Sequence, residues 1–544
     1  MPPGDRQRRF AHRLRRRPGG QACVAGPRTG CRAVLVSQAE PAPYRANVDW
    51  FIFSAGALGI LAVCLPLILF PEWGKAALTT AFEAVTHGLG SVYIVTAGAV
   101  LLFLLYLAFG RFGKVVLGDG SAPDYGDFSW TSMLFCGGIG TSVLYWGTVE
   151  WAYYYNAPPF GVAPGTDEAM RWAASYPIFH WGFIGWALYC LPGVAIAYAY
   201  HVRKMPVLRL SAACKAVLGR SADGWLGRIV DLLFMIGLLG AVSTGMGLAI
   251  AMIGAGLTRM TGIAPSFGLD LVVIATITAT FAVSVYVGLE AGIKRLSNLN
   301  VGLAFLLLAL VLAFGPTRHI VEQGTASVSH FLANFITMST WLDLSNSSGF
   351  DEAWTVFYWA WWLALGPFMG MFITKISGGR TIRQVVLGTL GWGTLGCTLF
   401  FVVLGSTAHY QEFNGQTEVL ALVNDGRANE AMVQMLATLP LGDLVLPLFV
   451  LICMIFAATS YDSAAYTLAS CATRSLPIHE HPARLHRVFW AFAIGGLPIS
   501  LIYVGGLLSL QSAVVVTSVP LLLVFALLAA SLVKGLIEDT PGRG

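Results

Sequence analysis

Charged residues are scarce in this chain of 544 residues. Asp, Glu, Lys and Arg make up 11% of the sequence, whereas a soluble globular domain usually contains about 25%. Hydrophobic residues make up 56%, and the mean hydropathy is +0.69. The shortage of charge therefore excludes an ordinary soluble protein and indicates a polytopic membrane protein.

The chain also lacks the motifs of metal and nucleophile chemistry. Its loops contain no HExxH, CxxC or GxSxG pattern, so no enzymatic activity is expected. A ligand sensor would usually carry a soluble output domain, and none is apparent, which leaves a membrane enzyme or sensor as a remote alternative. Most cysteines lie singly within or beside apolar stretches, which argues against disulfides and metal binding: Cys64, Cys136, Cys190, Cys397, Cys453 and Cys471.

Long apolar stretches recur along the chain instead. A transmembrane helix needs about 20 such residues. Twelve stretches qualify: 50–70, 91–110, 130–155, 174–199, 229–256, 268–288, 298–315, 353–376, 384–406, 443–472, 488–507 and 512–533. We therefore predict an all-α membrane protein with twelve transmembrane helices, whose even number places both termini on the same side.

The distribution of Lys and Arg predicts which side this is, because cytoplasmic loops carry an excess of positive charge. Of the 33 Lys and Arg residues, the only ones opposite the termini are Lys75, Arg171, Arg259, Arg318 and Arg427. Both termini are therefore expected in the cytoplasm. The expected segments include a basic cytoplasmic tail over 1–48, the first two spans over 49–110 and a short cytoplasmic C-terminus over 535–544.

An amphipathic helix is predicted over 318–345, between the seventh and eighth spans. Its apolar residues recur mostly at steps of three and four, and they are Val328, Phe331, Leu332, Phe335, Ile336, Met338 and Trp341. We expect this helix on the periplasmic face, either at the membrane surface or packed on the bundle or a neighbouring subunit.

Glycine and proline interrupt two of the apolar stretches. The third stretch contains Gly137-Gly138-Ile139-Gly140, and the eighth contains Gly366-Pro367 followed by Gly370. Such glycines often serve plain helix packing. Here, however, they open two five-span units of opposite orientation, 130–317 and 352–534. Matched helix breaks are typical of inverted-repeat transporters, in which the substrate binds where the helices unwind.

Tryptophan and tyrosine concentrate in two spans. The fourth contains Trp181, Trp186 and Tyr189, and the eighth contains Trp359, Trp361 and Trp362. Single tryptophans of membrane proteins commonly mark the lipid–water interface, but this clustering favours a cage for a cation that cannot donate a hydrogen bond. A trimethylammonium group gains about 0.5 to 2 kcal/mol from each well-placed ring.

From about Asp49 onward the sequence resembles the betaine/choline/carnitine transporter (BCCT) family. The segments that carry the resemblance are 137–140, His180-Trp181 through Trp186 and Tyr189, 354–359 leading to Trp361-Trp362, and 459–463. The resemblance implies a LeuT-like fold with a five-plus-five inverted repeat. It also implies a secondary transporter of the bacterial inner membrane that forms homotrimers, carries a small onium solute, and uses neither nucleic acid nor an organic cofactor.

The resemblance also implies the residues of the substrate site. The quaternary ammonium is expected between Trp181, Trp186, Tyr189 and Trp362, with Trp361 as a second wall and with Gly138, Ile139, Gly140 and Tyr153 completing the site. Leu365 stands where relatives carry a further aromatic residue. The choice between glycine betaine, carnitine and dimethylsulfoniopropionate is therefore left open.

Sodium is the coupling ion that the resemblance implies, and no other metal is expected. Its expected ligands are Thr459, Ser460, Phe456, Leu134 and Gly137. An isolated Thr-Ser pair would usually bond back to its own helix, so this assignment depends on the family context.

Four other positions separate symport from exchange. Asn300 stands where the ion-independent carnitine exchanger carries an arginine, which favours sodium coupling. Gly237 and Ala241 replace two threonines of a second sodium site, and Met369 stands where the exchanger also has a methionine. One sodium site is therefore expected. A sodium-independent exchanger of carnitine and butyrobetaine is the nearer alternative.

Titratable residues also occur within the predicted spans. Glu150 and Asp462 are acids in apolar surroundings, and their roles, functional or structural, are left open. His180, which precedes Trp181, is interpreted as a core residue.

Overall fold

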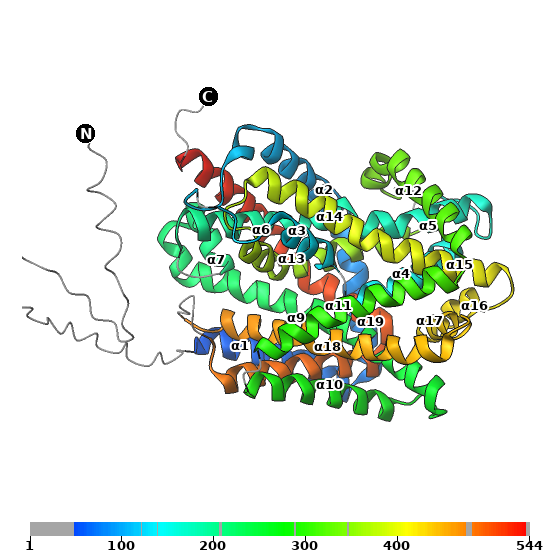
Figure 1. The fold of residues 1–544 in the computed structure, drawn as a ribbon. Coiled ribbons are helices and arrows are strands. Elements are labelled where there is room, and N and C mark those ends of the chain that lie inside the picture. The colour runs from blue at the N-terminus through cyan, green and yellow to red at the C-terminus, as the bar shows by residue number, and fades with distance from the viewer. Residues whose placement is uncertain are drawn as a thin grey trace, which may run out of the picture. The chain divides into compact units, whose positions relative to one another are not determined.

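The computed structural model describes residues 48–120, 122–138, 140–205, 209–287, 290–344, 348–474 and 481–539. Contacts divide the chain into Met1–Arg45 and Ala46–Gly544, and all described residues belong to the second unit. The described residues are almost entirely helical (Figure 1), which confirms the predicted all-α class. Except for Val48, the predicted basic tail over 1–48 lies outside the described residues.

Nine helical stretches of the described residues are long and apolar enough to cross a membrane. They are formed by α1 (Trp50–Leu69), α2 (Pro71–Phe109), α5 with α6 (Asp167–His180, Phe183–Ala197), α9 (Trp225–Thr261), α11 (Glu290–Phe314), α13 (Phe357–Ile376), α14 with α15 (Ile382–Phe400, Ser406–Phe413), α18 (Gly442–Cys471) and α19 (Arg484–Asp539). The prediction of several membrane-spanning helices is thus confirmed.

Four of the twelve predicted spans are built differently. The span over 130–155 is divided into α3 (Asp127–Cys136) and α4 (Thr141–Asn156), each too short to cross alone. The span over 268–288 is α10 (Phe267–Val287), whose apolar part is short. The last two spans both lie within α19, which bends at Gly505 and Gly506. Gly506 has a φ of 60°, in the left-handed region that favours glycine.

Shorter segments complete the helical structure of the described residues. They are α7 (Leu210–Ala213), α8 (Lys215–Leu218), α12 (Thr317–Thr340), α16 (Val419–Asn424), α17 (Ala428–Ala437), the 3-10 turns η1 (Arg111–Lys114) and η3 (Gly219–Asp223), and the π-helical turns η2 (Tyr198–Val202), η4 (Asp351–Val356) and η5 (Phe401–Gly405). The cysteines of the described residues are all free.

The break predicted in the third span is present. Helix α3 ends at Cys136 and α4 begins at Thr141, with the glycine cluster between them. Ile139, in the middle of this cluster, lies outside the described residues.

The break predicted in the eighth span was wrong, because α13 stays helical through Pro367. Its glycines serve close packing instead. A Cβ atom on Gly366 would lie 2.8 Å from the Leu188 carbonyl oxygen, and one on Gly370 would lie 2.8 Å from the Gly193 nitrogen. Both neighbours belong to α6, so these glycines let the backbones of α6 and α13 approach each other.

The second break lies in the fourth span, where the sequence did not predict one. Helix α5 ends at His180 and α6 begins at Phe183, leaving Trp181 and Gly182 between them. The two interruptions therefore lie in consecutive spans. The argument for an inverted repeat from matched breaks in spans three and eight is not supported.

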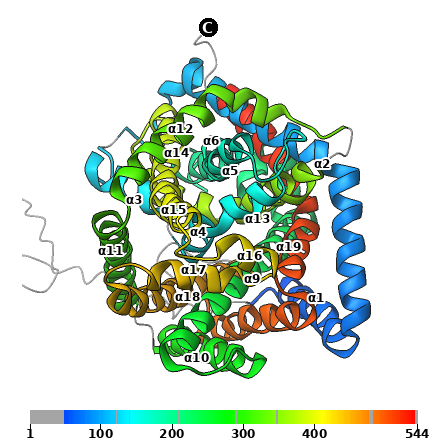
Figure 2. The same ribbon diagram turned by 90° about the vertical axis from the view of Figure 1, so that its right-hand side faces the viewer.

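Helix α12 occupies most of the stretch predicted to be amphipathic. It buries Ile320, Phe331 and Met338 and exposes Leu332 and Ile336. Its buried face lies along α5 and α15 (Figure 2), so this helix is packed on the helical bundle.

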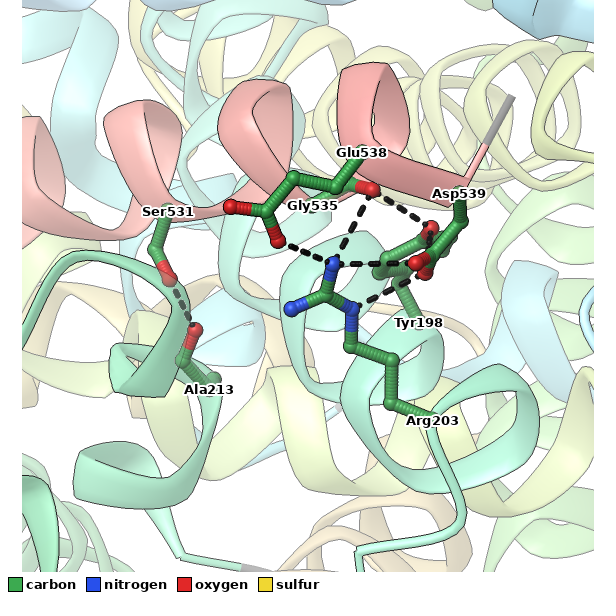
Figure 3. A network of polar contacts seen from close by, with 7 residues as sticks. All are labelled: Tyr198, Arg203, Ala213, Ser531, Gly535, Glu538 and Asp539. Carbon is green, nitrogen blue, oxygen red and sulfur yellow. Dashed lines mark hydrogen bonds and ion pairs between the residues drawn. The ribbon is translucent and has the colours of Figure 1, made fainter. Parts of the chain in front are cut away.

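The last turn of α19 is held against the end of the fourth span (Figure 3). Arg203 donates to Glu538 at 2.7 Å and to Asp539 at 2.9 Å, and the Tyr198 hydroxyl donates to Asp539 at 2.6 Å. About two turns earlier, Ser531 donates to the Ala213 carbonyl of α7 at 2.8 Å. The predicted C-terminal segment over 535–544 is therefore helical as far as Asp539.

Candidate substrate site

Five predicted aromatic residues come together between the broken fourth span and α13. Trp181 lies in the break, Trp186 and Tyr189 lie on α6, and Trp361 and Trp362 lie on α13. None of the five is more than 7% exposed. We refer to these five residues as the aromatic box.

Trp362 lies at the centre of the box. Its ring centroid lies 5.6 Å from that of Trp181, 5.8 Å from that of Trp186 and 4.3 Å from that of Tyr189. Trp361 lies 5.9 Å from Trp181. Among the described residues no ring contact joins Trp181 to Trp186 or Tyr189. Trp181 is therefore separated from these two residues, and Trp362 contacts all three. Several converging ring faces are the arrangement that binds quaternary ammonium groups.

Other predicted substrate residues are divided between the box and a separate cluster. A Cβ atom on Gly138 would lie 2.7 Å from Trp186 Cζ2, so the helix break borders the box. Gly140 precedes α4 and has open space around it. Tyr153 does not join the box, because its ring contacts those of Trp354 at 5.1 Å and Trp146 at 6.0 Å.

A buried carboxylate holds one wall of the box. Glu150 of α4 accepts hydrogen bonds from the Trp181 indole at 3.1 Å, the Tyr358 hydroxyl at 2.6 Å and the Tyr154 hydroxyl at 2.6 Å. The side chain is fully buried. Glu150 therefore acts as a positioning residue for Trp181. The sequence signalled it only as an acid in an apolar span.

His180 extends this network away from the box. Its Nδ1 atom lies 2.9 Å from the Tyr154 hydroxyl, and its Nε2 atom lies 3.1 Å from the Thr355 hydroxyl. Both ring nitrogens have partners, as expected of a core residue. By contrast, the buried Trp361 indole N–H has no hydrogen-bond partner among the described residues.

A cavity lies beside the box, bounded by α4, α5, α12 and η5. Trp146, Trp151, Ser327, Phe401 and His409 contribute to its lining. The ring of Phe401 lies 5.5 Å from that of Trp181. The Phe401 side chain therefore lies between this cavity and the Trp181 wall of the box.

The predicted sodium ligands are only partly gathered. The Thr459 hydroxyl donates to the Ile455 carbonyl at 2.9 Å and lies 3.4 Å from the Phe456 carbonyl oxygen, so it bonds back to its own helix. Ser460 is exposed. Across the bundle, Gly137 donates to Leu134 at 3.1 Å.

One place where α18 approaches the start of α4 is near Gly245 of α9, because a Cβ atom there would lie 3.3 Å from the Tyr461 hydroxyl and 3.6 Å from the Ser142 hydroxyl. The hydroxyl and carbonyl oxygens in this region have the hard, neutral character that suits sodium.

The positions that distinguish symport from exchange lie at different helix contacts. Met369 borders the break, because a Cβ atom on Gly137 would lie 3.5 Å from its methyl carbon. The Asn300 amide donates to the Ile452 carbonyl of α18 at 3.1 Å. Gly237 faces Leu521 of α19, and Ala241 is buried nearby on α9.

A comparison with protein families identifies the chain. The model of the BCCT, betaine/carnitine/choline family transporter, matches residues 51–541. The chain belongs to the betaine/carnitine/choline transporter family. Its aromatic box, the break at Gly137–Gly140 and α18 all lie within the matched residues. The resemblance seen in the sequence is thus confirmed.

Three curated relatives of this BCCT protein are similar over most of their length. An uncharacterized transporter, YeaV, of Escherichia coli is 36% identical over 80% of this chain and 91% of its own. A carnitine transporter of Acinetobacter baumannii is 32% identical over 90% of this chain and 89% of its own. An osmo-independent choline transporter, BetT1, of Acinetobacter baylyi is 33% identical over 92% of this chain and 95% of its own.

A solved structure of a Na⁺-coupled sialic acid symporter aligns with 78% of this chain and 80% of that chain, at 16% identity and a TM-score of 0.38. The family match and the curated relatives are sufficient to establish that this BCCT protein is a multi-pass membrane transporter of the carnitine and choline type, and that it is not an enzyme.

Proposed function

We propose that this BCCT transporter imports a zwitterionic quaternary ammonium or sulfonium solute, such as glycine betaine, carnitine or dimethylsulfoniopropionate, by sodium symport across the bacterial inner membrane. The observation that carries the proposal is the buried aromatic box centred on Trp362. A methylated cation interacts with its ring faces without requiring a hydrogen-bond acceptor.

The carboxylate of such a solute has complementary groups close to the box. The break next to Trp186 leads into the N-terminus of α4, where backbone N–H groups point outward and the helix dipole favours negative charge. The unpartnered indole N–H of Trp361 is a further donor. These groups favour a zwitterion over choline, which has no carboxylate.

Sodium coupling is proposed through one site between α18 and the break in the third span. The Thr459 hydroxyl and the Phe456 carbonyl would be its ligands on α18, with Ser460, Leu134 and Gly137 completing the set. A cation bound there would stabilise the binding-competent shape of the break and so raise substrate affinity. Sodium-independent exchange is the second candidate, favoured by the place of Met369 against Gly137.

We further propose twelve crossings, with the units 130–317 and 352–534 related as an inverted repeat and both termini cytoplasmic. The division of the third span, the short apolar part of α10 and the bend in α19 account for the three additional crossings. Ion pairs join groups that the charge distribution assigns to the same side, such as Arg203 with Asp539 at 2.9 Å and Arg228 with Asp49 at 3.2 Å.

The test is uptake of radiolabelled glycine betaine and carnitine into proteoliposomes under an inward sodium gradient, with potassium as the control cation. Sodium-driven uptake into empty vesicles is expected. Uptake that requires preloaded substrate and ignores sodium would establish the exchanger instead. Absence of uptake of either solute in both arms would contradict the proposed substrate class.

The sodium site is tested by the double variant Thr459→Ala, Ser460→Ala. Removing two oxygen ligands should raise the sodium concentration needed for half-maximal uptake by about tenfold or more, because each hydrogen-bonding or ligating group contributes about 1 kcal/mol. Thr467→Ala is a matched control, since this buried threonine of α18 also bonds back to its helix, at 2.9 Å. Unchanged sodium dependence in the double variant would refute the site.

A further inference from the structure

Two tryptophans of the aromatic box rest on glycines. A Cβ atom built on Gly393 of α14 would lie 2.2, 2.4 and 2.5 Å from Cδ2, Cε2 and Cε3 of Trp186. These atoms surround the fusion of the two indole rings. Because their distances are nearly equal, Gly393 must lie against the flat face of the Trp186 ring.

Gly185 of α6 has the same relation to Trp362. A Cβ atom there would lie 2.5, 2.8 and 2.9 Å from Cε2, Cδ2 and Cζ2 of the Trp362 indole. Real Cβ atoms essentially never come within 3.0 Å of such neighbours. Any side chain at Gly185 or Gly393 would therefore have to displace a wall of the box.

Backbone conformation does not explain these glycines. Both lie inside regular helices, α6 and α14, and neither has a positive φ. A glycine inside a helix costs about 0.5–1 kcal/mol relative to alanine. Close approach of the indole face is the property that only glycine provides at these two positions.

Trp186 is closely surrounded by its neighbours. Gly393 covers one face of Trp186. Gly138 and the Cys397 thiol lie close to the edge of the ring. A Cβ atom on Gly138 would lie 2.7 Å from Trp186 Cζ2 and 2.8 Å from Cys397 Sγ. Cys397 is 1% exposed. A Cβ atom added at Gly393 would therefore have to displace the Trp186 ring from its place in the box.

We propose that Gly393 and Gly185 are positioning residues that set the aperture of the aromatic box and thereby select solutes by the number of methyl groups on the cationic head. Without side chains at these positions, Trp186 lies directly against α14 and Trp362 lies directly against α6, and the resulting spacing of the two rings gives room for a trimethylated head. This inference rests on the proposed function and specifies which part of its solute class the site accepts.

The experiment compares Gly393→Ala with Gly391→Ala, both on α14. Gly391 is a matched control because a Cβ atom there would meet no heavy atom within 4 Å. Binding to the purified full-length transporter is measured by competition and by tryptophan fluorescence, with glycine betaine against dimethylglycine and carnitine against its dimethyl analogue. Losing good contact with one ring weakens binding by about 2- to 30-fold.

Gly393→Ala should therefore weaken binding of the trimethylated solutes by about tenfold. Binding of the dimethylated solutes should fall by less, so that the ratio of the two affinities shifts by at least about threefold. The preference of Gly391→Ala should equal that of the wild type. The double variant Gly393→Ala, Trp186→Phe should restore the preference, because the smaller ring gives back the space. This double variant also tests the inference if Gly393→Ala alone does not fold. Gly185→Ala, alone and combined with Trp362→Phe, provides a second test of the same kind.

An unchanged preference in folded Gly393→Ala, or no restoration in the double variant, would overturn the role of these glycines while leaving the transporter's solute class intact. Failure of the wild-type protein to bind any of the four solutes would overturn the proposed function and, with it, this inference.

Discussion

Glu150 shows how an acid buried within a membrane protein can hold one wall of a proposed binding site in place. Its carboxylate accepts hydrogen bonds from Trp181, Tyr154 and Tyr358, which come from three different helical segments or their junctions. A buried donor that loses its acceptor costs about 1–3 kcal/mol. The carboxylate therefore fixes the position of Trp181 relative to α13.

Removing this carboxylate should disorganise the box. Glu150→Ala leaves the buried donors of Trp181 and Tyr358 without their acceptor, while Tyr154 keeps its contact with His180, so both the melting temperature and solute affinity should fall clearly. Glu150→Gln retains one carbonyl oxygen and should lie between the wild type and Glu150→Ala. Thermal unfolding in detergent and equilibrium binding check this order. An alanine variant as stable and as tight-binding as the wild type would show that the network is dispensable.

Trp362 should be the most sensitive residue of the box, because its ring contacts three others. Trp362→Leu is expected to weaken binding of every methylated onium solute by about 2- to 30-fold through loss of its π face. Trp392→Leu is the control, since Trp392 on α14 is 42% exposed. Equal uptake by both variants, with equal membrane insertion, would place the site elsewhere.

The identity of the box residues was predictable from the sequence, whereas their support was not. Trp186, Tyr189 and Trp362 cluster in segments whose chemistry indicates a cation site. The contact of Trp181 with Glu150 depends on where the fourth span breaks. The contact of the Trp186 ring with Gly393 is formed between α6 and α14, which are far apart in sequence. Tyr153 was assigned to the site by resemblance, but its neighbour Tyr154 belongs to the network around Glu150.

Among the helices, the breaks were the least predictable feature. A glycine lowers helix stability wherever it stands, so sequence alone does not separate unwinding from close packing. The cluster at Gly137 unwinds the third span, whereas Gly366 and Gly370 bring α13 close to α6 without a break. Which outcome occurs depends on the neighbouring helix.

The packing of α12 on α15 should depend on pH. His319 Nε2 lies 2.9 Å from His409 Nδ1, with Glu322 and Tyr410 also near His319. Burial lowers the pKa of His319 below its usual value of about 6.5, although Glu322 acts in the opposite direction. The folded protein thus binds this proton less readily than the unfolded chain, so the contact is fully stable above about pH 6.5 and weakens as the pH falls.

Hydrogen exchange within α12, corrected for intrinsic rates, should therefore be faster at pH 5.5 than at pH 7.5 in the wild type. His319→Gln should remove most of this pH dependence. His87→Gln, which changes a histidine with a 56% exposed side chain on α2, should leave it unchanged. Identical pH dependence in His319→Gln and the wild type would refute the role of this pair.

For the whole molecule, the hydropathy pattern predicts where helices lie better than it predicts how each one crosses the membrane. All twelve predicted stretches coincide with helical segments, yet α3 and α4 are individually too short and α19 unites two stretches across Gly505 and Gly506. Local composition determines the helices. The breaks and bends between helical segments depend on contacts with segments that are distant in sequence.

The proposed orientation predicts opposite labelling at two exposed arginines. Arg427→Cys should react with a membrane-impermeant maleimide in intact spheroplasts, because Arg427 belongs to the sparsely charged side. Arg220→Cys should react only after the membrane is opened. Cys23 and Cys31 are replaced by Ser in both variants to remove background. Labelling of Arg220→Cys in intact cells would reverse the orientation.

The ion pair between Arg203 and the end of α19 mechanically couples two distant parts of the chain. Arg203 directly follows η2, the continuation of the helix that carries Trp186 and Tyr189, and Asp539 is the last residue of α19. A displacement of α6 during transport must either carry the last turn of α19 along or break this ion pair. A fluorescent probe attached just beyond Asp539 would thus report movement of α6 from outside the membrane, without any label in the aromatic box itself.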